Sequence, residues 1–352
     1  MKLKISALTK SFPKALYLPL ALIVLCSHDL YIKMDGYFLQ PNQQASLSLY
    51  NGTFEKSENI ITRDRMLDAS VVAHGERTAI QPEQWRDQDS TITRLDFNTG
   101  KPGTYVAGVS TKARNIALTA DQFNNYLKHD GVLDMILKRT NDNSLNEDAV
   151  ESYEKHVKAI YQVGDVKTED WKTVLGYPIE FVPLANPYEK YNGDKLEVKL
   201  LLDGQPLTNQ LVYADHIKSD NTHDQQGHSH NHQEEGHSHA HKGDSEAASA
   251  EGHTHTSGQQ LRTNAEGVVN VNLPEEGVYY LRTIHMIEVT DSDELTHRSK
   301  WATLTFEVSH RHDSSTHTHD DHHHEGGIPT WIFIMGSLLV IGLLFLVFRK
   351  KN

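Results

Sequence analysis

Apolar and polar residues alternate over much of residues 28–118, which is the spacing of a half-buried β-strand. Ala45, Leu47 and Leu49 alternate with polar residues and are followed by Asn51-Gly52, a pair typical of hairpin turns. Glycines and prolines separate further short apolar segments. Short strands joined by frequent turns predict a first β-sandwich domain over residues 28–118.

The apolar spacing changes to three and four residues after position 118. Phe123, Tyr126 and Leu127 follow this spacing, which is typical of an amphipathic helix. The same spacing recurs at Val132, Leu133, Ile136 and Leu137. Ser144 and Glu147 form a capping box, which predicts the start of a second helix whose apolar residues extend to Tyr161. We expect residues 119–168 to be a helical connector that packs on the first sheet.

Strand patterns return over residues 169–309 and predict a second β-sandwich domain. Leu196, Val198 and Leu200 alternate before an Asp-Gly turn, and similar segments continue to position 308. Residues 219–259 interrupt this pattern, because they are polar and have no period. Loop closure costs grow only slowly with loop length, so we expect a disordered insertion inside one domain. The predicted fold is mainly β, with two sandwiches of the immunoglobulin or prealbumin type.

The two ends of the chain predict export and anchoring. Residues 1–27 have a basic start and a short apolar segment, as in a signal peptide, and small Ser27 is a plausible last residue before cleavage. An uncleaved signal anchor is the alternative. Residues 328–348 carry no charge and span roughly 30 Å as a helix, the thickness of one membrane. The basic tail 349–352 places the C-terminus in the cytoplasm and the rest of the chain outside.

Composition narrows the possible partners. The formal net charge of −13 argues against nucleic acid and favours attraction of cations. The single cysteine, Cys26, lies within the predicted signal, so the mature chain has no thiol for disulfides or catalysis. A lipoprotein signal at this cysteine conflicts with the leucine that precedes it.

Histidines are concentrated in two segments. Of 23 histidines, nine lie between His223 and His255, and seven lie between His310 and His324 in the juxtamembrane segment 310–327. Many of them recur at every second position. Alternate residues of an extended chain point to the same side, about 7 Å apart, so two imidazoles can reach one ion after a modest bend. The candidate ligands in these two tracts are His228, His230, His232, His237, His239, His241, His253, His255, His310, His312, His317, His319, His322, His323 and His324.

These tracts predict weak metal sites that exchange quickly. No apolar residues organise them, so binding must also offset the cost of ordering the chain. The alternatives are a solvated low-complexity linker without metal function and a pH sensor based on clustered histidines. The remaining histidines are weaker candidates. His129 and His156 are expected on helix surfaces, and His285 is expected to cap the end of a core face that it shares with Tyr279 and Leu281.

His28 is a special case, because cleavage after Ser27 would make it the N-terminal residue. Its α-amine and its ring Nδ1 could then bind one ion as a chelate. Because the two donors belong to one residue, little further entropy is lost when they are brought to the same ion. The alternative is that His28 is merely the first residue of a strand.

Several segments together resemble a known family. They are His28-Asp29-Leu30, Gly103-Thr104-Tyr105-Val106, residues 118–127, residues 153–159, residues 178–184, residues 202–207, Thr263-Asn264-Ala265-Glu266-Gly267, His285-Met286 and residues 300–306. In this order they resemble a bacterial periplasmic family of unknown function, formerly labelled a nickel-uptake (NikM-like) component and associated with nickel and cobalt energy-coupling-factor transporters. The resemblance covers most of residues 28–309. It implies two immunoglobulin- or prealbumin-like domains, a role near metal uptake, and family-typical histidines at His28 and His285. The histidine-rich insertion departs from that family's usual short loop.

The sequence therefore predicts an auxiliary metal-binding protein of the periplasm, held in the inner membrane by one C-terminal helix. We expect it to capture a divalent transition metal and to pass it to a membrane transporter, with nickel first and cobalt, zinc or copper as alternatives. A tight site would join His28 and His285. The competing functions are a zinc or copper buffer for metal resistance and an adhesion or scaffold module without metal. An enzyme is not expected, because no nucleophile elbow, phosphate loop or His-Glu-x-x-His motif occurs.

Overall fold

The computed structural model of the chain describes residues 29–218 and 257–309. These residues form one compact unit that is mainly β, which confirms the predicted fold class at that level. The strands of its first half are β1 (Asp29–Met34), β2 (Phe38–Leu39), β3 (Gln44–Gly52), β4 (Met66–Ala73), β5 (Glu76–Ala79), β6 (Trp85–Gln88), β7 (Ile92–Asn98), β8 (Gly103–Thr111) and β9 (Arg114–Leu118). The later strands are β10 (Ala149–Val163), β11 (Ile179–Pro183), β12 (Lys195–Leu202), β13 (Gln205–Pro206), β14 (Leu211–Ile217), β15 (Gln259–Arg262), β16 (Val268–Asn272), β17 (Gly277–Glu288) and β18 (His297–Val308).

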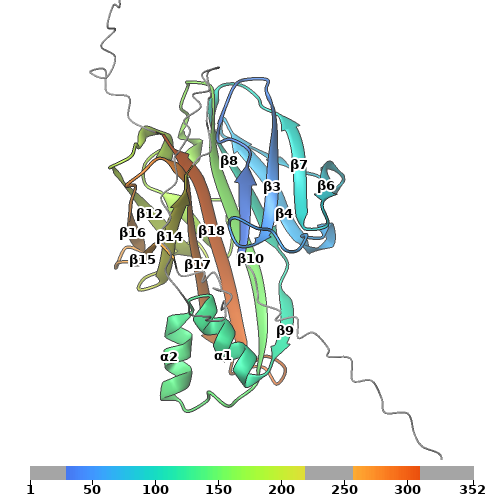
Figure 1. The fold of residues 1–352 in the computed structure, drawn as a ribbon, viewed down its shortest axis with the longest axis vertical. Coiled ribbons are helices and arrows are strands. Elements are labelled where there is room, and N and C mark those ends of the chain that lie inside the picture. Colours follow the sequence, from blue (N-terminus) through green and yellow to red (C-terminus); the bar gives the residue numbers. More distant parts are fainter. Residues whose placement is uncertain (1–28, 219–256, 310–352) are drawn as a thin grey trace, which may run out of the picture. The chain divides into compact units, whose positions relative to one another are not determined.

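The strands form three sheets (Figure 1). A four-stranded sheet has the order β1-β3-β7-β6, and a second small sheet joins β11, β12, β13 and β16. The large ten-stranded sheet has the order β15-β14-β17-β18-β10-β8-β4-β5, and β2 and β9 also pair with β10. This large sheet takes strands from both predicted sandwich domains.

Strand β10 joins the two parts of the large sheet. It pairs antiparallel with β8 on one side and parallel with β18 on the other, with Glu151 opposite His297 and Ala159 opposite Thr305. The capping box predicted a helix over this segment, and that prediction is wrong. Residues 155–163 are buried without interruption in the interior of the sheet, so the alternation that marks a strand is lost from the sequence.

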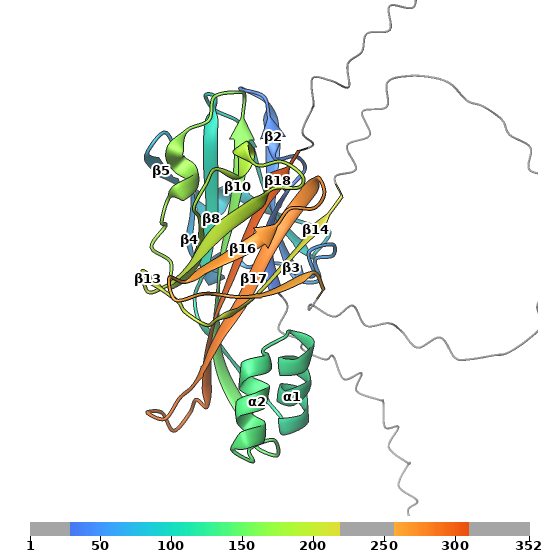
Figure 2. The same ribbon diagram turned by 90° about the vertical axis from the view of Figure 1, so that its left-hand side faces the viewer.

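The other predicted helical segment is confirmed. Helices α1 (Ala120–His129) and α2 (Leu133–Asn141) lie at one end of the long strands β10, β17 and β18 (Figures 1 and 2). Their buried side chains join a second apolar cluster, separate from the main core between the sheets. This cluster consists of Leu118, Phe123, Tyr126, Leu127, Val132, Met135, Ala149, Ile284 and Trp301.

The strands that flank the histidine-rich insertion pair with each other. β14 runs antiparallel to β15, and Ala214 lies opposite Gln259. Gln259 thus belongs to a strand and not to the insertion, which moves the predicted boundary back to the residues before it. The residues on either side of the insertion therefore belong to neighbouring strands of one sheet.

The predicted signal peptide, the juxtamembrane segment and the segment 328–348 lie outside the described residues. Within the described residues, no helix is both long enough and apolar enough to cross a membrane.

Candidate functional site

Of the histidines proposed as metal ligands, His285 lies in the described part of the chain. His28 and the histidines of both tracts lie outside it. The geometry of a predicted tight site can therefore be examined at His285 and at Asp29, the residue bonded to His28.

His285 lies on β17, half-buried at the end of the face that carries Tyr279 and Leu281. Its ring Nδ1 lies 2.9 Å from Oε1 of Gln210. Burial lowers the pKa of His285 below its usual value, and nearby Lys300 lowers it further while Asp203 opposes this effect. The ring is consequently neutral at neutral pH, the state in which imidazole binds a metal.

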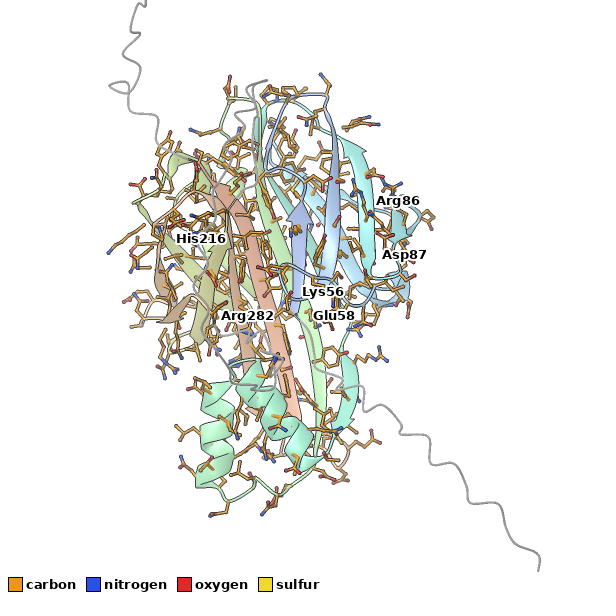
Figure 3. All side chains as sticks on the ribbon, viewed as in Figure 1. Lys56, Glu58, Arg86, Asp87, His216 and Arg282 are labelled. Carbon is orange, nitrogen blue, oxygen red and sulfur yellow. The ribbon has the colours of Figure 1, made fainter. Side chains whose placement is uncertain are left out.

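The start of β1 meets a second group of polar residues, which we call the Asp29 cluster: Asp29, Asp130, Glu151, Lys155 and Arg282. All five side chains are buried. Nε of Arg282 donates to Oδ2 of Asp29 at 2.6 Å, and Nη2 of Arg282 donates to the carbonyl of Asp130 at 2.7 Å. Figure 3 shows Arg282 between β17 and the helices. Although burial opposes it, the Asp29 carboxylate raises the pKa of Arg282 above its usual value, so the guanidinium stays charged.

Two carboxyl groups of this cluster, those of Glu151 and Asp130, are only partly satisfied by hydrogen bonds. Oε1 of Glu151 accepts from the hydroxyls of Tyr126 and Ser299, and Oδ1 of Asp130 lies 2.8 Å from Nδ1 of His129. Oε2 of Glu151 and Oδ2 of Asp130 are buried and have no hydrogen-bond partner among the described residues. Burial raises the pKa of Glu151 to about 7, and burial lowers the pKa of Lys155 to about 8. The cluster can therefore exchange a proton near neutral pH.

His285 and the Asp29 cluster belong to opposite faces of β17. Arg282 reaches Asp29, and His285 is three positions further along a strand whose pairing with β18 is regular. Side chains alternate between the two faces of a strand, so residues three apart point to opposite sides. A site that joined His285 to the start of β1 would need ligands from both faces of the sheet.

The two histidines that were expected on helix surfaces have different outcomes. His156 is buried on β10, where its Nδ1 lies 2.9 Å from the Ser110 hydroxyl, so its assignment to a helix surface is wrong. His129 ends α1, as a helix prediction requires, but it contacts the Asp29 cluster through Asp130. Sequence reasoning missed Asp130 and Glu151, because isolated carboxylates in a polar segment carry no signal of burial.

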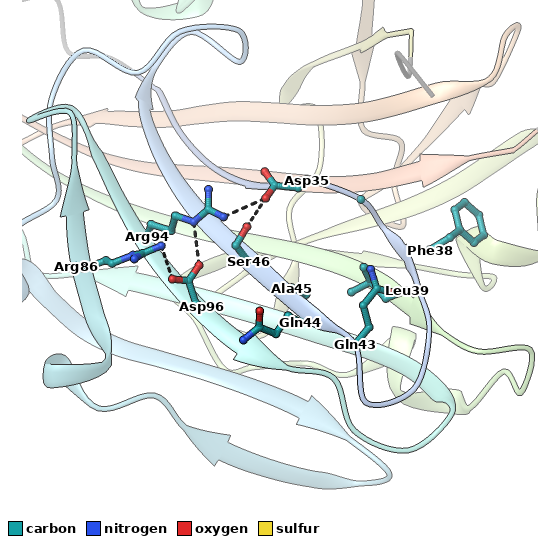
Figure 4. A pocket seen from close by; sticks show the side chains of 11 residues that line it. Asp35, Phe38, Leu39, Gln43, Gln44, Ala45, Ser46, Arg86, Arg94 and Asp96 are labelled. Carbon is teal, nitrogen blue, oxygen red and sulfur yellow. Dashed lines mark hydrogen bonds and ion pairs between the residues drawn. The ribbon is translucent and has the colours of Figure 1, made fainter. Parts of the chain in front are cut away.

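A polar depression of about 510 Å³ lies over the first small sheet (Figure 4). Arg94 pairs with Asp35 and Asp96, and Arg86 also pairs with Asp96. The charges balance within these pairs, and no histidine lines the depression. Across residues 29–218 and 257–309, no three His, Cys, Asp or Glu side chains are arranged so that they could hold a metal ion together.

A family model matches residues 25–287 of the chain; its description is a domain of unknown function, DUF4198. No curated protein matches the sequence.

Several solved structures are similar at low identity. The D0-D1 domain of Intimin is 9% identical, with 79% of this chain and 97% of that chain covered and a TM-score of 0.17. The Yersinia pseudotuberculosis adhesin InvE is 11% identical, with coverages of 80% and 58% and a TM-score of 0.19. Tandem Ig domains of titin are 11% identical, with coverages of 81% and 95% and a TM-score of 0.15. Scores this low support no inference about function.

Proposed function

The chain belongs to the DUF4198 family, since the family model covers most of it, and from that premise we propose that it is an auxiliary metal-binding protein outside the cytoplasm. It captures a divalent transition metal, nickel first, and passes the ion to a transporter in the inner membrane. The observation that carries this proposal is the concentration of histidines at alternate positions in two polar tracts. Under this proposal the protein is not an enzyme.

The physical character of the tracts suits capture and release. Each pair of imidazoles offers nitrogen ligands that nickel, cobalt, zinc and copper accept. Because the residues between the histidines are mostly small or polar, binding has to order the chain, so individual sites are weak and exchange quickly. The net charge of −13 raises the local concentration of cations. The pairing of β14 with β15 supports the proposal, because the strands on either side of the insertion pair with each other.

The finer features of the fold form part of the same proposal. The mature chain begins at His28 and builds two immunoglobulin- or prealbumin-like sandwiches. Residues 328–348 anchor it as a single transmembrane helix, with its C-terminus in the cytoplasm. The nickel-uptake association of the related family is consistent with this arrangement.

The decisive experiment separates metal capture from folding. Residues 219–256 are deleted in one variant, and in a matched variant of unchanged length every histidine of this segment is replaced by serine. Equilibrium dialysis of the purified full-length protein against Ni²⁺ measures capacity, and urea denaturation measures stability. We expect both variants to lose about half or more of the weakly bound nickel and to unfold as the parent does, since both flanking strands remain paired.

Three outcomes would count against the proposal. Unchanged nickel capacity in both variants contradicts capture by the tract. A preference for zinc or copper in the cell, measured as metal content after native purification, favours a buffer or resistance protein instead. Loss of capacity without any change in cellular nickel uptake favours a scaffold whose histidines are incidental.

A further inference from the structure

The amide of Gln210 is held in one orientation by its surroundings. Its Nε2 donates to the hydroxyl oxygen of Thr283 at 3.0 Å and to the carbonyl of Ile284 at 3.1 Å. The Thr283 hydroxyl itself donates to the carbonyl of Leu211 at 2.6 Å, so its oxygen is left to accept from Gln210. The backbone N–H of Gln210 donates to Thr263 at 2.8 Å, which fixes the main chain as well. A flipped amide would point its carbonyl oxygen at the Ile284 carbonyl oxygen, which is unfavourable.

This orientation determines the tautomer of His285. Oε1 of Gln210 faces Nδ1 of the histidine at 2.9 Å, and an amide oxygen can only accept a hydrogen bond. Nδ1 must therefore carry the proton in the neutral ring. Nε2 then has a free lone pair. Among the described residues, the ring forms its hydrogen bond with Gln210, through Nδ1.

The surroundings of the ring leave room for a ligand. His285 borders a pocket of about 220 Å³ between the start of α2 and the β13–β14 connection. Leu207, Leu211 and Met286 supply apolar lining, and Asp130, Asp134 and Arg282 are its charged lining residues. Lys300 lies opposite His285 on β18, and its ammonium pairs with Asp203 at 2.8 Å. The Asp203 carboxylate offsets part of the Lys300 charge near the ring.

The geometry points to Gln210 as the positioning residue of a single-histidine metal site, in which it holds His285 in the Nδ1–H form and presents Nε2 to a divalent transition metal. This inference rests on the proposed function and adds to it a folded ligand outside the tracts. Metal-binding histidines commonly donate their second ring N–H to an oxygen, which fixes the ring and strengthens the ligand. One imidazole in a fixed position gives a transient site, because the other ligands of the ion are exchangeable.

The experiment measures the tautomer of His285 and its affinity for Ni²⁺ separately. The full-length protein is labelled with ¹⁵N-histidine, and His285→Gln assigns the signals of residue 285. In the metal-free protein near pH 7.5, two-bond ¹H–¹⁵N correlations should show Nδ1 protonated and Nε2 bare. Gln210→Met, which removes both the acceptor and the donors, should abolish this preference.

Ni²⁺ alone then serves as the probe. Titration should broaden the ring signals of His285, and Gln210→Met should weaken this binding about 10–100-fold. A parent ring protonated at Nε2, or equal Ni²⁺ binding by the parent and Gln210→Met, overturns the inference. If the tracts bind no nickel while His285 shows the expected tautomer and binds Ni²⁺, the proposed capture by the tracts fails and this inference stands.

Discussion

Oδ2 of Asp29 accepts a 2.6 Å hydrogen bond from Nε of Arg282, a residue 253 positions later in the chain. Both side chains are only 2% exposed. Because the same guanidinium also donates to the Asp130 carbonyl, it holds together β1, β17 and the connection between the two helices. The residue next to the predicted N-terminus is thereby fixed from the far end of the sequence.

Replacing Arg282 with methionine should lower the free energy of unfolding by about 3–5 kcal/mol, because Asp29 would keep a buried charge without its partner. The matched control is Arg262→Met. Arg262 pairs with Asp134 at 2.9 Å, but both side chains are largely exposed, so its loss should cost less than about 1 kcal/mol. Urea denaturation of both variants checks this. Equal losses of stability in the two variants would show that burial does not determine how much each ion pair contributes to stability.

Glu151→Gln should change how stability depends on pH. The folded pKa of Glu151 is raised to about 7 from its ordinary 4.5, so between these values the folded state holds a proton that the unfolded state has lost. The free energy of unfolding of the parent should therefore fall as pH rises from 4.5 to 7. The glutamine variant has no carboxyl group to ionise here, so it should not lose this stability. Its free energy of unfolding, measured relative to that of the parent, should therefore increase by about 3 kcal/mol from pH 4 to pH 8. Urea denaturation at both pH values, with exposed Glu266→Gln as the control, measures the gain; an unchanged difference would contradict the expected burial of charge.

His297 should produce a slope of the opposite sign. Burial, with a further contribution from Arg139, lowers its pKa to about 4 from 6.5, and its Nε2 is buried without a partner. As pH falls from 6.5 to 4 the unfolded state takes up a proton that the folded state refuses, so stability is lost by up to about 3 kcal/mol. His297→Phe should remove this acid sensitivity while it preserves the ring contact with Phe123. Thermal unfolding at pH 4.5 and 7.5 tests it, and an acid-sensitive phenylalanine variant would assign the effect to another group.

The N-terminus provides a further prediction. The intact mass of the purified protein should correspond to a chain that starts at His28. Adding one alanine before it removes the α-amine from the chelate and keeps the imidazole, so affinity at a tight nickel site should fall at least tenfold, about 1.4 kcal/mol. Capacity of the tracts should not change. Equal affinity, or a mass that includes the basic residues 2–14, would exclude His28 as an N-terminal ligand.

Strands with one exposed face could be predicted from the sequence, whereas the second half of β10, which is buried on both faces, could not. Leu196, Val198 and Leu200 alternate as expected and are fully buried on β12, beside exposed charged neighbours. β10 has no such neighbours in its second half, so its apolar spacing was mistaken for a helix. The pair Asn51-Gly52 was expected to turn, yet both residues still pair with β1, since the chain reverses only after them.

The candidate site was predictable only in part for a similar reason. The alternation of side chains along a strand correctly placed His285 at the end of the face that carries Tyr279. Nothing in the sequence, however, indicates that Gln210 lies beside His285. Helix spacing suggested Leu137 for the buried face of α2, whereas Leu137 is 60% exposed and Met135 and Arg139 are buried. Such contacts depend on pairings between distant strands, and local patterns do not encode them.

The position of β18 bears on how the protein is made. β18 is the last strand along the described chain, yet it occupies the interior of the large sheet, between β17 and β10. A chain that emerges from a ribosome or a translocation channel N-terminus first leaves one edge of β10 unpaired until residue 308 has appeared. An open strand edge invites pairing with other chains, and contacts this distant in sequence form slowly. We therefore expect chains truncated before β18, in which this edge of β10 stays open, to be cleared by proteolysis or to aggregate.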